Sequence, residues 1–235
     1  MKIIFALLIV LLNFYPGSDI KISAYQHSSR YTKLTRKIVD QKIADINRFF
    51  DLKKTEINIL LFNDHKIFHT LTGLPDHIPG ALLSNTNRIF LKTPDLTAMS
   101  RQQNENLISH EMIHAIQNQK ISLTLFPDWF NEGLAEYFSE DFTIDQKVQL
   151  SKFLLHKEPP DLDELRIISH KYQQLAVMDY ILSASIIEFL LVNYGNDVFK
   201  SIFTEMQKNK NFYASLFKVT HLTEEQFEFY WHEYL

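Results

Sequence analysis

The hydrophobic pattern changes near Pro94, and this change limits the fold more than any other feature of the chain. Upstream of it, helical spacing over 28–50 is followed by the apolar, β-branched run Glu56–Phe62 and by two short apolar runs around a polar turn at 85–87. Downstream of it, apolar residues recur at helical spacing almost to the last residue. We therefore expect an α+β chain, in which a small N-terminal α/β lobe with short strands precedes a mainly helical lobe.

The same pattern predicts individual elements. Gly73 and Gly195 are expected to end the helices before them, Asp128 to cap the helix that it begins, and Thr223 with Gln226 to form a capping box. The predicted domains are an N-terminal segment at 1–24, an α/β lobe at 25–96 and a helical lobe at 97–235. Strands are predicted at 56–62, 81–84 and 88–92, and helices at 28–50, 66–72, 98–119, 128–140, 143–156, 179–194, 197–208, 212–220 and 224–235.

The N-terminus has the form of an export signal. Lys2 precedes an uncharged apolar run at 3–12, which is shorter than the roughly 20 residues of a membrane-spanning helix. Ala24 would allow cleavage before Tyr25, although the residues approaching that point are polar. An uncleaved membrane anchor at 3–15 and a buried core segment are the alternatives. We expect an extracytoplasmic protein, either periplasmic or secreted.

The chain contains no cysteine and carries a formal net charge of −4. The lack of cysteine excludes disulfides, thiolate nucleophiles and zinc sites built from cysteine. Lys and Arg are scattered along the sequence, so no basic patch predicts nucleic acid as a partner.

An HExxH motif, His110-Glu111-Met112-Ile113-His114, lies inside the long helix predicted for 98–119. Side chains four residues apart share one face of a helix, about 6 Å apart along its axis, so both imidazoles can bind one metal ion. Glu111 is then placed beside a metal-bound water, where it can act as general base. Burying these ionisable groups in an apolar helical seam would be costly, and a metal ion compensates that cost. The motif therefore predicts one catalytic Zn²⁺.

A second segment, Trp129-Phe130-Asn131-Glu132-Gly133-Leu134-Ala135-Glu136-Tyr137, follows in the next predicted helix. The two segments together resemble the gluzincin metallopeptidases, which take HExxH from one helix and a glutamate from the next. The second segment is similar to the Asn-Glu-Gly-Phe/Leu-Ala stretch of the aminopeptidase-like branch, and most of all to its small peptidase-MA-like domains. The resemblance implies that Glu132 is the third zinc ligand. It also implies a zincin-like fold with the active-site cleft between the lobes.

The resemblance implies roles for two further residues. Glu136 lies four residues after Glu132, where gluzincins place a carboxylate that accepts a hydrogen bond from a ligand histidine. Tyr180 begins a predicted helix at the place where the aminopeptidase-like branch has a tyrosine that stabilises the oxyanion. Tyr172 is the rival candidate for that role, and a core tyrosine or a surface carboxylate is the alternative in each case.

One departure from the family bears on the substrate. Related aminopeptidases carry a Gly-x-Met-Glu-Asn strand whose glutamate holds the free amine of the substrate, whereas this chain has Gly80-Ala81-Leu82-Leu83-Ser84-Asn85. That strand could still pair with an extended peptide, but it offers no carboxylate. We therefore expect a zinc-dependent endopeptidase rather than a strict aminopeptidase, acting on a peptide or protein. The alternatives are a non-catalytic secreted or anchored binding protein that retains the fold, and a zinc hydrolase of non-peptide amides.

Overall fold

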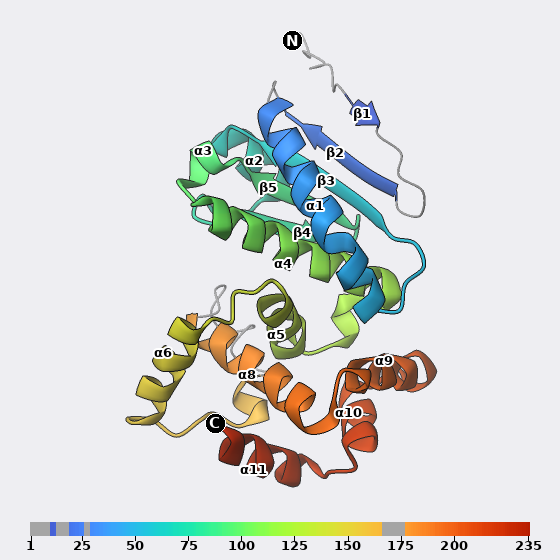
Figure 1. The fold of residues 1–235 in the computed structure, drawn as a ribbon, viewed down its shortest axis with the longest axis vertical. Helices are drawn as coiled ribbons and strands as arrows, with labels where there is room; N and C mark the ends of the chain where they lie inside the picture. The colour runs from blue at the N-terminus through green and yellow to red at the C-terminus, as the bar shows by residue number, and fades with distance from the viewer. Residues whose placement is uncertain (1–9, 13–18, 26–28, 166–176) are drawn as a thin grey trace. The chain divides into compact units, whose positions relative to one another are not determined.

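The chain divides into two compact units, Met1–Gln119 and Lys120–Leu235. The computed structural model describes residues 10–12, 19–25, 29–165 and 177–235 (Figure 1). The predicted boundary at residue 96 lies upstream of this division, because the helix between the two positions belongs with the sheet. Asn118 and Gln119, near the end of that helix, donate hydrogen bonds to the carbonyl oxygens of Ser84 and Glu56.

The first unit is built on a five-stranded sheet of order β1-β2-β3-β5-β4. β2, β3 and β5 are parallel, and the two edge strands β1 and β4 are antiparallel to their neighbours. The described elements of this unit are β1 (Val10–Leu12), β2 (Asp19–Ala24), α1 (Ser29–Phe49), β3 (Glu56–Phe62), α2 (His65–Thr72), β4 (Gly80–Leu83), β5 (Arg88–Lys92), α3 (Pro94–Thr97) and α4 (Arg101–Lys120).

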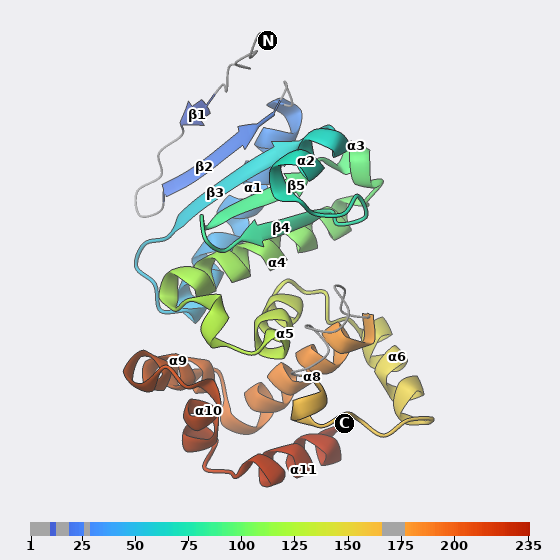
Figure 2. The same ribbon diagram turned by 180° about the vertical axis from the view of Figure 1, so that it is seen from behind.

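Helices cover both faces of this sheet. α1 and α4 lie on one face and α2 on the other, as Figures 1 and 2 show together. In β3, Ile57, Ile59 and Leu61 alternate with residues of the opposite face, and all three are almost fully buried. On the α2 side, Phe62 packs edge-on against Phe68, with ring centroids 5.4 Å apart. The predicted α+β class with a small strand-containing lobe first is confirmed.

The second unit is helical throughout its described part. α5 and α8 pack against each other, and Phe126, Phe130 and Phe212 form an aromatic cluster beside α5, with centroids 4.6–5.8 Å apart. α8 is long and apolar enough to cross a membrane, alone among the described helices, but half of it is buried, as in the core helix of a soluble domain. The elements are a 3₁₀ turn at Leu123–Leu125, α5 (Asp128–Phe138), α6 (Ile144–Leu154), α8 (Val177–Tyr194), α9 (Asp197–Asn209), α10 (Phe212–Thr220) and α11 (Glu224–Tyr234).

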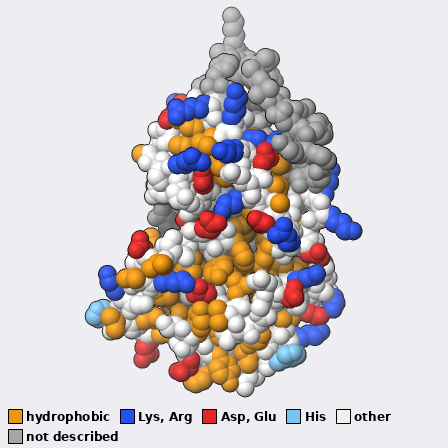
Figure 3. Space-filling view, in the orientation of Figure 1, with side chains coloured by type: hydrophobic (Ala, Val, Ile, Leu, Met, Phe, Trp, Pro, Cys, Tyr) orange, Lys and Arg blue, Asp and Glu red, His pale blue; other side chains and the backbone are white. Residues whose placement is uncertain are grey.

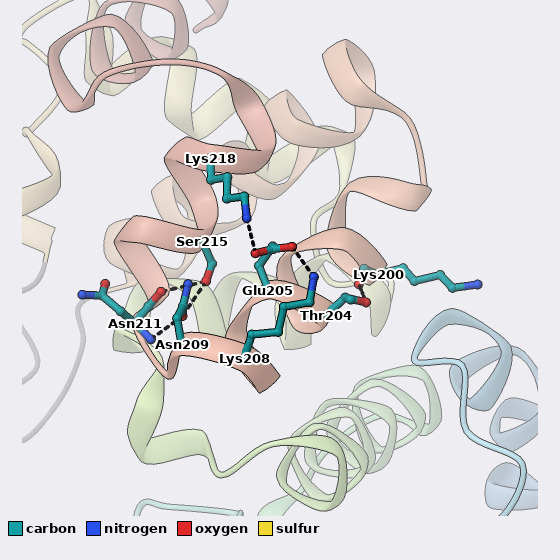
Figure 4. A network of polar contacts seen from close by, with 8 residues as sticks. All are labelled: Lys200, Thr204, Glu205, Lys208, Asn209, Asn211, Ser215 and Lys218. Carbon is teal, nitrogen blue, oxygen red and sulfur yellow. Dashed lines mark hydrogen bonds and ion pairs between the residues drawn. The ribbon is translucent and has the colours of Figure 1, made fainter.

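Polar side chains join α9 to α10. Glu205 on α9 accepts hydrogen bonds from Lys208 Nζ at 2.6 Å and from Lys218 Nζ on α10 at 2.7 Å (Figure 4). Asn209 Oδ1 accepts from Ser215 Oγ at 3.1 Å in the same network. These two hydrogen-bonded lysines lower the pKa of the Glu205 carboxyl below its ordinary value.

Most helix and strand predictions hold to within two residues, and the informative exception is the start of α4. A helix was predicted from residue 98, but Ala98 adopts a left-handed conformation, with φ of 53°, and ends α3. A capping box then starts α4. Ser100 Oγ accepts from Gln103 N at 3.2 Å, and Gln103 Oε1 accepts from Ser100 N at 2.9 Å.

Other end signals are confirmed. Gly73 closes α2 with φ of 71°, and the Thr223–Gln226 capping box starts α11. Gly195 follows α8 with φ of 75°. The predicted cap at Asp128 is wrong by one residue, because Pro127 holds the extended conformation of the cap and Asp128 is the first helical residue.

Candidate metal centre

Helix α4 places the two histidines of the HExxH motif. Every residue from Glu111 to Gln117 is buried, so the motif lies in the most enclosed part of the helix. Met112, Ile113 and Ile116 are fully buried and account for the apolar content of this stretch. Because the helix is buried along this stretch, the position of the HExxH side chains is fixed by packing. Burying their polar groups costs free energy unless these groups are hydrogen-bonded or bind a metal ion.

Side-chain amides fix the C-terminal end of α4 to the sheet. Gln119 Oε1 accepts from Glu56 N at 2.8 Å, and Gln119 Nε2 donates to Glu56 O at 2.8 Å, so the amide completes the backbone pairing at the start of β3. The adjacent Asn118 donates from Nδ2 to Ser84 O at 2.9 Å and to Asn87 Oδ1 at 3.1 Å. The helix that carries the histidines is therefore tied to both β3 and the β4–β5 turn.

The imidazoles of His110 and His114 converge. Their Nε2 atoms lie 3.1 Å apart, and the rings are nearly perpendicular. Two nitrogens bound to one tetrahedral zinc at roughly 2.0–2.1 Å would lie about 3.3 Å apart, close to the observed separation. A hydrogen bond from one imidazole to the other also places the two Nε2 atoms about this far apart. A metal ion bound between them would replace the shared proton.

The third predicted ligand, Glu132, lies on α5. The helix is fixed by close packing on α8: a Cβ added at Gly133 would lie 2.5 Å from Ser183 O and 2.9 Å from Ile187 Cγ1. Only glycine permits this approach. On the other side of Glu132, Asn131 Nδ2 donates to Leu123 O at 3.2 Å. Both neighbours of the proposed ligand therefore serve to position α5.

His110, His114 and Glu132 form a group that could hold a metal ion. Each offers one ligand atom, and the three atoms lie within 4.8 Å of one another. No other group of this kind occurs among the described histidine and carboxylate residues. Two neutral imidazoles and one carboxylate are a donor set that zinc accepts in catalytic sites, so the residues fit the predicted ion.

Glu111 and Glu136 are both buried carboxylates, with 5% and 8% of their surface exposed. Glu111 lies beside His110 on α4, as the motif predicts. Glu136 lies on α5, one turn after Glu132, and its Oε1 accepts from Gln146 Nε2 on α6 at 2.8 Å. The predicted hydrogen bond between Glu136 and a ligand histidine stays a prediction.

Tyr180 is half-buried in the first turn of α8. It precedes Ser183, the residue that Gly133 contacts, by one helical turn, so its helix is held against the helix that bears Glu132. The rival candidate Tyr172 lies outside the described residues. The oxyanion role of Tyr180 stays a prediction.

The strand proposed to bind peptide is β4, an edge of the described sheet. The segment that leads into β4 is held by Lys92, the last residue of β5. Lys92 N donates a hydrogen bond to Pro79 O at 2.8 Å, and the buried Lys92 Nζ donates to Asp76 O at 2.5 Å. Burial lowers the pKa of this lysine. A Cβ on Gly80, the first residue of β4, would lie 3.6 Å from Leu107 on α4, so the strand starts beside the helix that carries the HExxH motif.

The positioning contacts of three side chains, Gln146, Asn118 and Gln119, could not be predicted from the sequence. The Gln146–Glu136 hydrogen bond joins residues of two helices, and nothing in the spacing of either residue indicates it. The Asn118 and Gln119 contacts follow the HExxH motif by one turn, and their position at the end of a predicted helix was the only available signal.

In comparisons with known proteins, no family model and no curated sequence matches this chain.

Proposed function

We propose that this chain is a zinc-dependent metallopeptidase of the gluzincin type, in which His110, His114 and Glu132 hold one zinc ion. The observation that carries the proposal is the convergence of their three ligand atoms, two of them from an HExxH helix. The proposal includes the zincin-like fold that the motifs imply.

Zinc bound in this way would act as a Lewis acid toward a water molecule and the scissile carbonyl. Glu111, adjacent in sequence to His110, would accept a proton from the attacking water and pass it to the leaving amine. The Tyr180 hydroxyl would donate a hydrogen bond to the carbonyl oxygen as negative charge develops on it. Burial of Glu111 supports this role, because a carboxylate shielded from bulk water exchanges protons mainly with its immediate neighbours.

We propose internal peptide bonds as the substrate. β4 is an edge strand, so an extended peptide can add to the sheet there through backbone hydrogen bonds. Residues 80–84 contain no carboxylate that could hold a terminal amine. Peptides with acetylated and with free N-termini should therefore be cleaved at similar rates, and a strong requirement for the free amine would contradict this part of the proposal.

The test of the enzymatic role is Glu111→Gln in the full chain, assayed on mixed peptides with and without a chelator. The variant should bind zinc as the wild type does yet lose hydrolysis by about 10³-fold or more, because the ligands remain and the base is gone. Equal activity in the variant would exclude Glu111 as the base. A zinc-loaded wild type that cleaves no peptide would favour the non-catalytic binding protein.

We also propose that the protein is exported, on the evidence of the apolar run after Lys2. The position at which a signal peptide is cleaved decides which N-terminal strands remain in the sheet. β2 pairs with β3 along its whole length, and Ile20 and Ile22 are buried, so cleavage before Tyr25 would remove β2 from the sheet together with the edge strand β1. N-terminal sequencing of the mature protein decides this: a start between residues 13 and 19 removes β1 and keeps β2, and a start at Tyr25 supports the predicted boundary.

A further inference from the structure

Helix α6 is held differently from its neighbours in the second unit. Of its residues only Leu150 is buried, while Ile144 and Val148 are 79% and 46% exposed. Hydrophobic side chains are numerous on the face of this unit that Figure 3 shows. The apolar side chains that α6 buries, Leu150 and in part Phe153 and Leu154, lie in its C-terminal half, so the position of its first turn depends more on polar contacts.

Two polar contacts leave the first turn of α6. Lys147 Nζ forms an ion pair with Glu188 on α8, and Gln146 Nε2 donates to Glu136 Oε1 on α5 at 2.8 Å. The first of these is partly exposed to solvent, and the second ends on a carboxylate that is 8% exposed. Hydrogen bonds to buried, charged groups are the stronger kind, so the Gln146 contact is the more consequential one.

The contact between Gln146 and Glu136 determines the orientation of the Gln146 side-chain amide. A carboxylate accepts hydrogen bonds, so the amide nitrogen of Gln146 must face Glu136 and the amide oxygen must point away. The backbone of Gln146 is held in turn by the cap of α6, where Thr143 Oγ1 accepts from Gln146 N at 3.4 Å. The capped backbone and the Gln146 side chain thus present one donor to one oxygen of Glu136.

We propose that Gln146 is a positioning residue for the metal centre. By holding Oε1 it sets the rotation of the Glu136 carboxylate, and so determines how the other oxygen is presented on the face of α5 that also bears Glu132. This inference rests on the proposed function, since it assigns Glu136 to the support of the zinc ligands. Substitution of the direct partner of a metal ligand typically weakens metal binding about 10–100-fold. Gln146 acts one step further away, so a loss of about 3–10-fold is expected.

The experiment measures zinc affinity of the full chain by competition with a chromophoric chelator, which requires no substrate. Gln146→Met removes the donor and keeps the length of the side chain. Gln149→Met makes the same change at an exposed position of the same helix and should bind zinc as the wild type does. Leu150→Ala loosens α6 by truncating its one buried residue, and shows what loosening alone does to affinity.

A double-mutant cycle with Glu136→Met, which removes the accepting oxygen, separates positioning from general structure. Gln146→Met should weaken zinc binding about 3–10-fold in the wild type and have no further effect once Glu136 is changed. An equal loss in both backgrounds, wild-type affinity in Gln146→Met, or the same loss in Leu150→Ala at equal thermal stability would overturn the inference while leaving the zinc site intact. A wild type that binds no zinc would overturn the proposed function and the inference together.

Discussion

Helices α5 and α6 belong to the same unit and pack against the same helix, α8, in opposite ways. α5 meets α8 backbone to backbone at Gly133, with no room for a methyl group. α6 buries one leucine and reaches its neighbours through long polar side chains. The helix that bears the proposed ligand is thereby fixed by steric contact, whereas α6 is held to its neighbours by side-chain hydrogen bonds and an ion pair. The difference suggests two kinds of residue: Gly133, which the packing of the fold requires, and Gln146, which we propose adjusts the metal centre.

The largest effect should come from Gly133→Ala. The new Cβ would approach backbone atoms of Ser183 within 2.5–2.8 Å, and backbone cannot rotate away as a side chain can. We expect the free energy of unfolding to fall by about 3 kcal/mol, measured by chemical denaturation. Gly195→Ala is the control, because it has open space around it and only a left-handed φ of 75°, which costs roughly 1–2 kcal/mol. Equal losses in the two variants would show that the α5–α8 contact is less tight than described.

A smaller effect is expected at the start of α6. Thr143→Ala removes the cap that accepts from Gln146 N, which costs about 1 kcal/mol. Because α6 is lightly packed, amide hydrogen exchange should quicken within 144–154 and stay unchanged in α5 and α8. Faster exchange throughout α5 as well would mean that the two helices unfold together, and the contrast between them would be lost.

The smallest effect concerns the contact between Tyr234 on α11 and Glu188 on α8 at alkaline pH. Burial, together with the charge and hydrogen bond of Glu188, raises the pKa of Tyr234 to about 12 from its ordinary value of 10.0. A raised folded pKa gives stability that is complete below pH 10 and lost as the pH rises through about 12. Glu188→Gln should lower the pKa of Tyr234 and shift this loss to lower pH, measured by tyrosinate absorbance and by unfolding. An unchanged titration would mean that burial alone raises the pKa.

The sequence predicted what depends on spacing along the chain. The i, i+4 histidines share a helical face in any helix, so their convergence followed from the motif, and β3 was readable from its β-branched run. The start of α4 was also readable, since Ser100 and Gln103 have the capping-box spacing, but the apolar pattern was followed upstream to Ala98 instead. The resemblance to gluzincins supplied Glu132, which spacing alone does not identify.

What could not be predicted depends on contacts between elements. Gln146 stands three residues after Thr143, the spacing of a capping box, which would turn its side chain back to its own helix, and only the approach of α6 to α5 gives that side chain to Glu136. The reason for glycine at position 133 lies in the backbone of Ser183, fifty residues away in sequence. That the first compact unit extends to Gln119 depends on contacts of the same kind, because the amides of Asn118 and Gln119 tie α4 to the strands before it.

The central claim is that His110, His114 and Glu132 bind one zinc ion, and metal analysis of the purified full chain tests it most directly. The wild type should contain close to one zinc per chain after dialysis against metal-free buffer. His114→Ala should lose most of it while remaining folded, whereas substitution of the histidine at 156, which is exposed and outside the group, should change nothing. A wild type without zinc, or a His114→Ala protein with wild-type zinc content, would contradict the account.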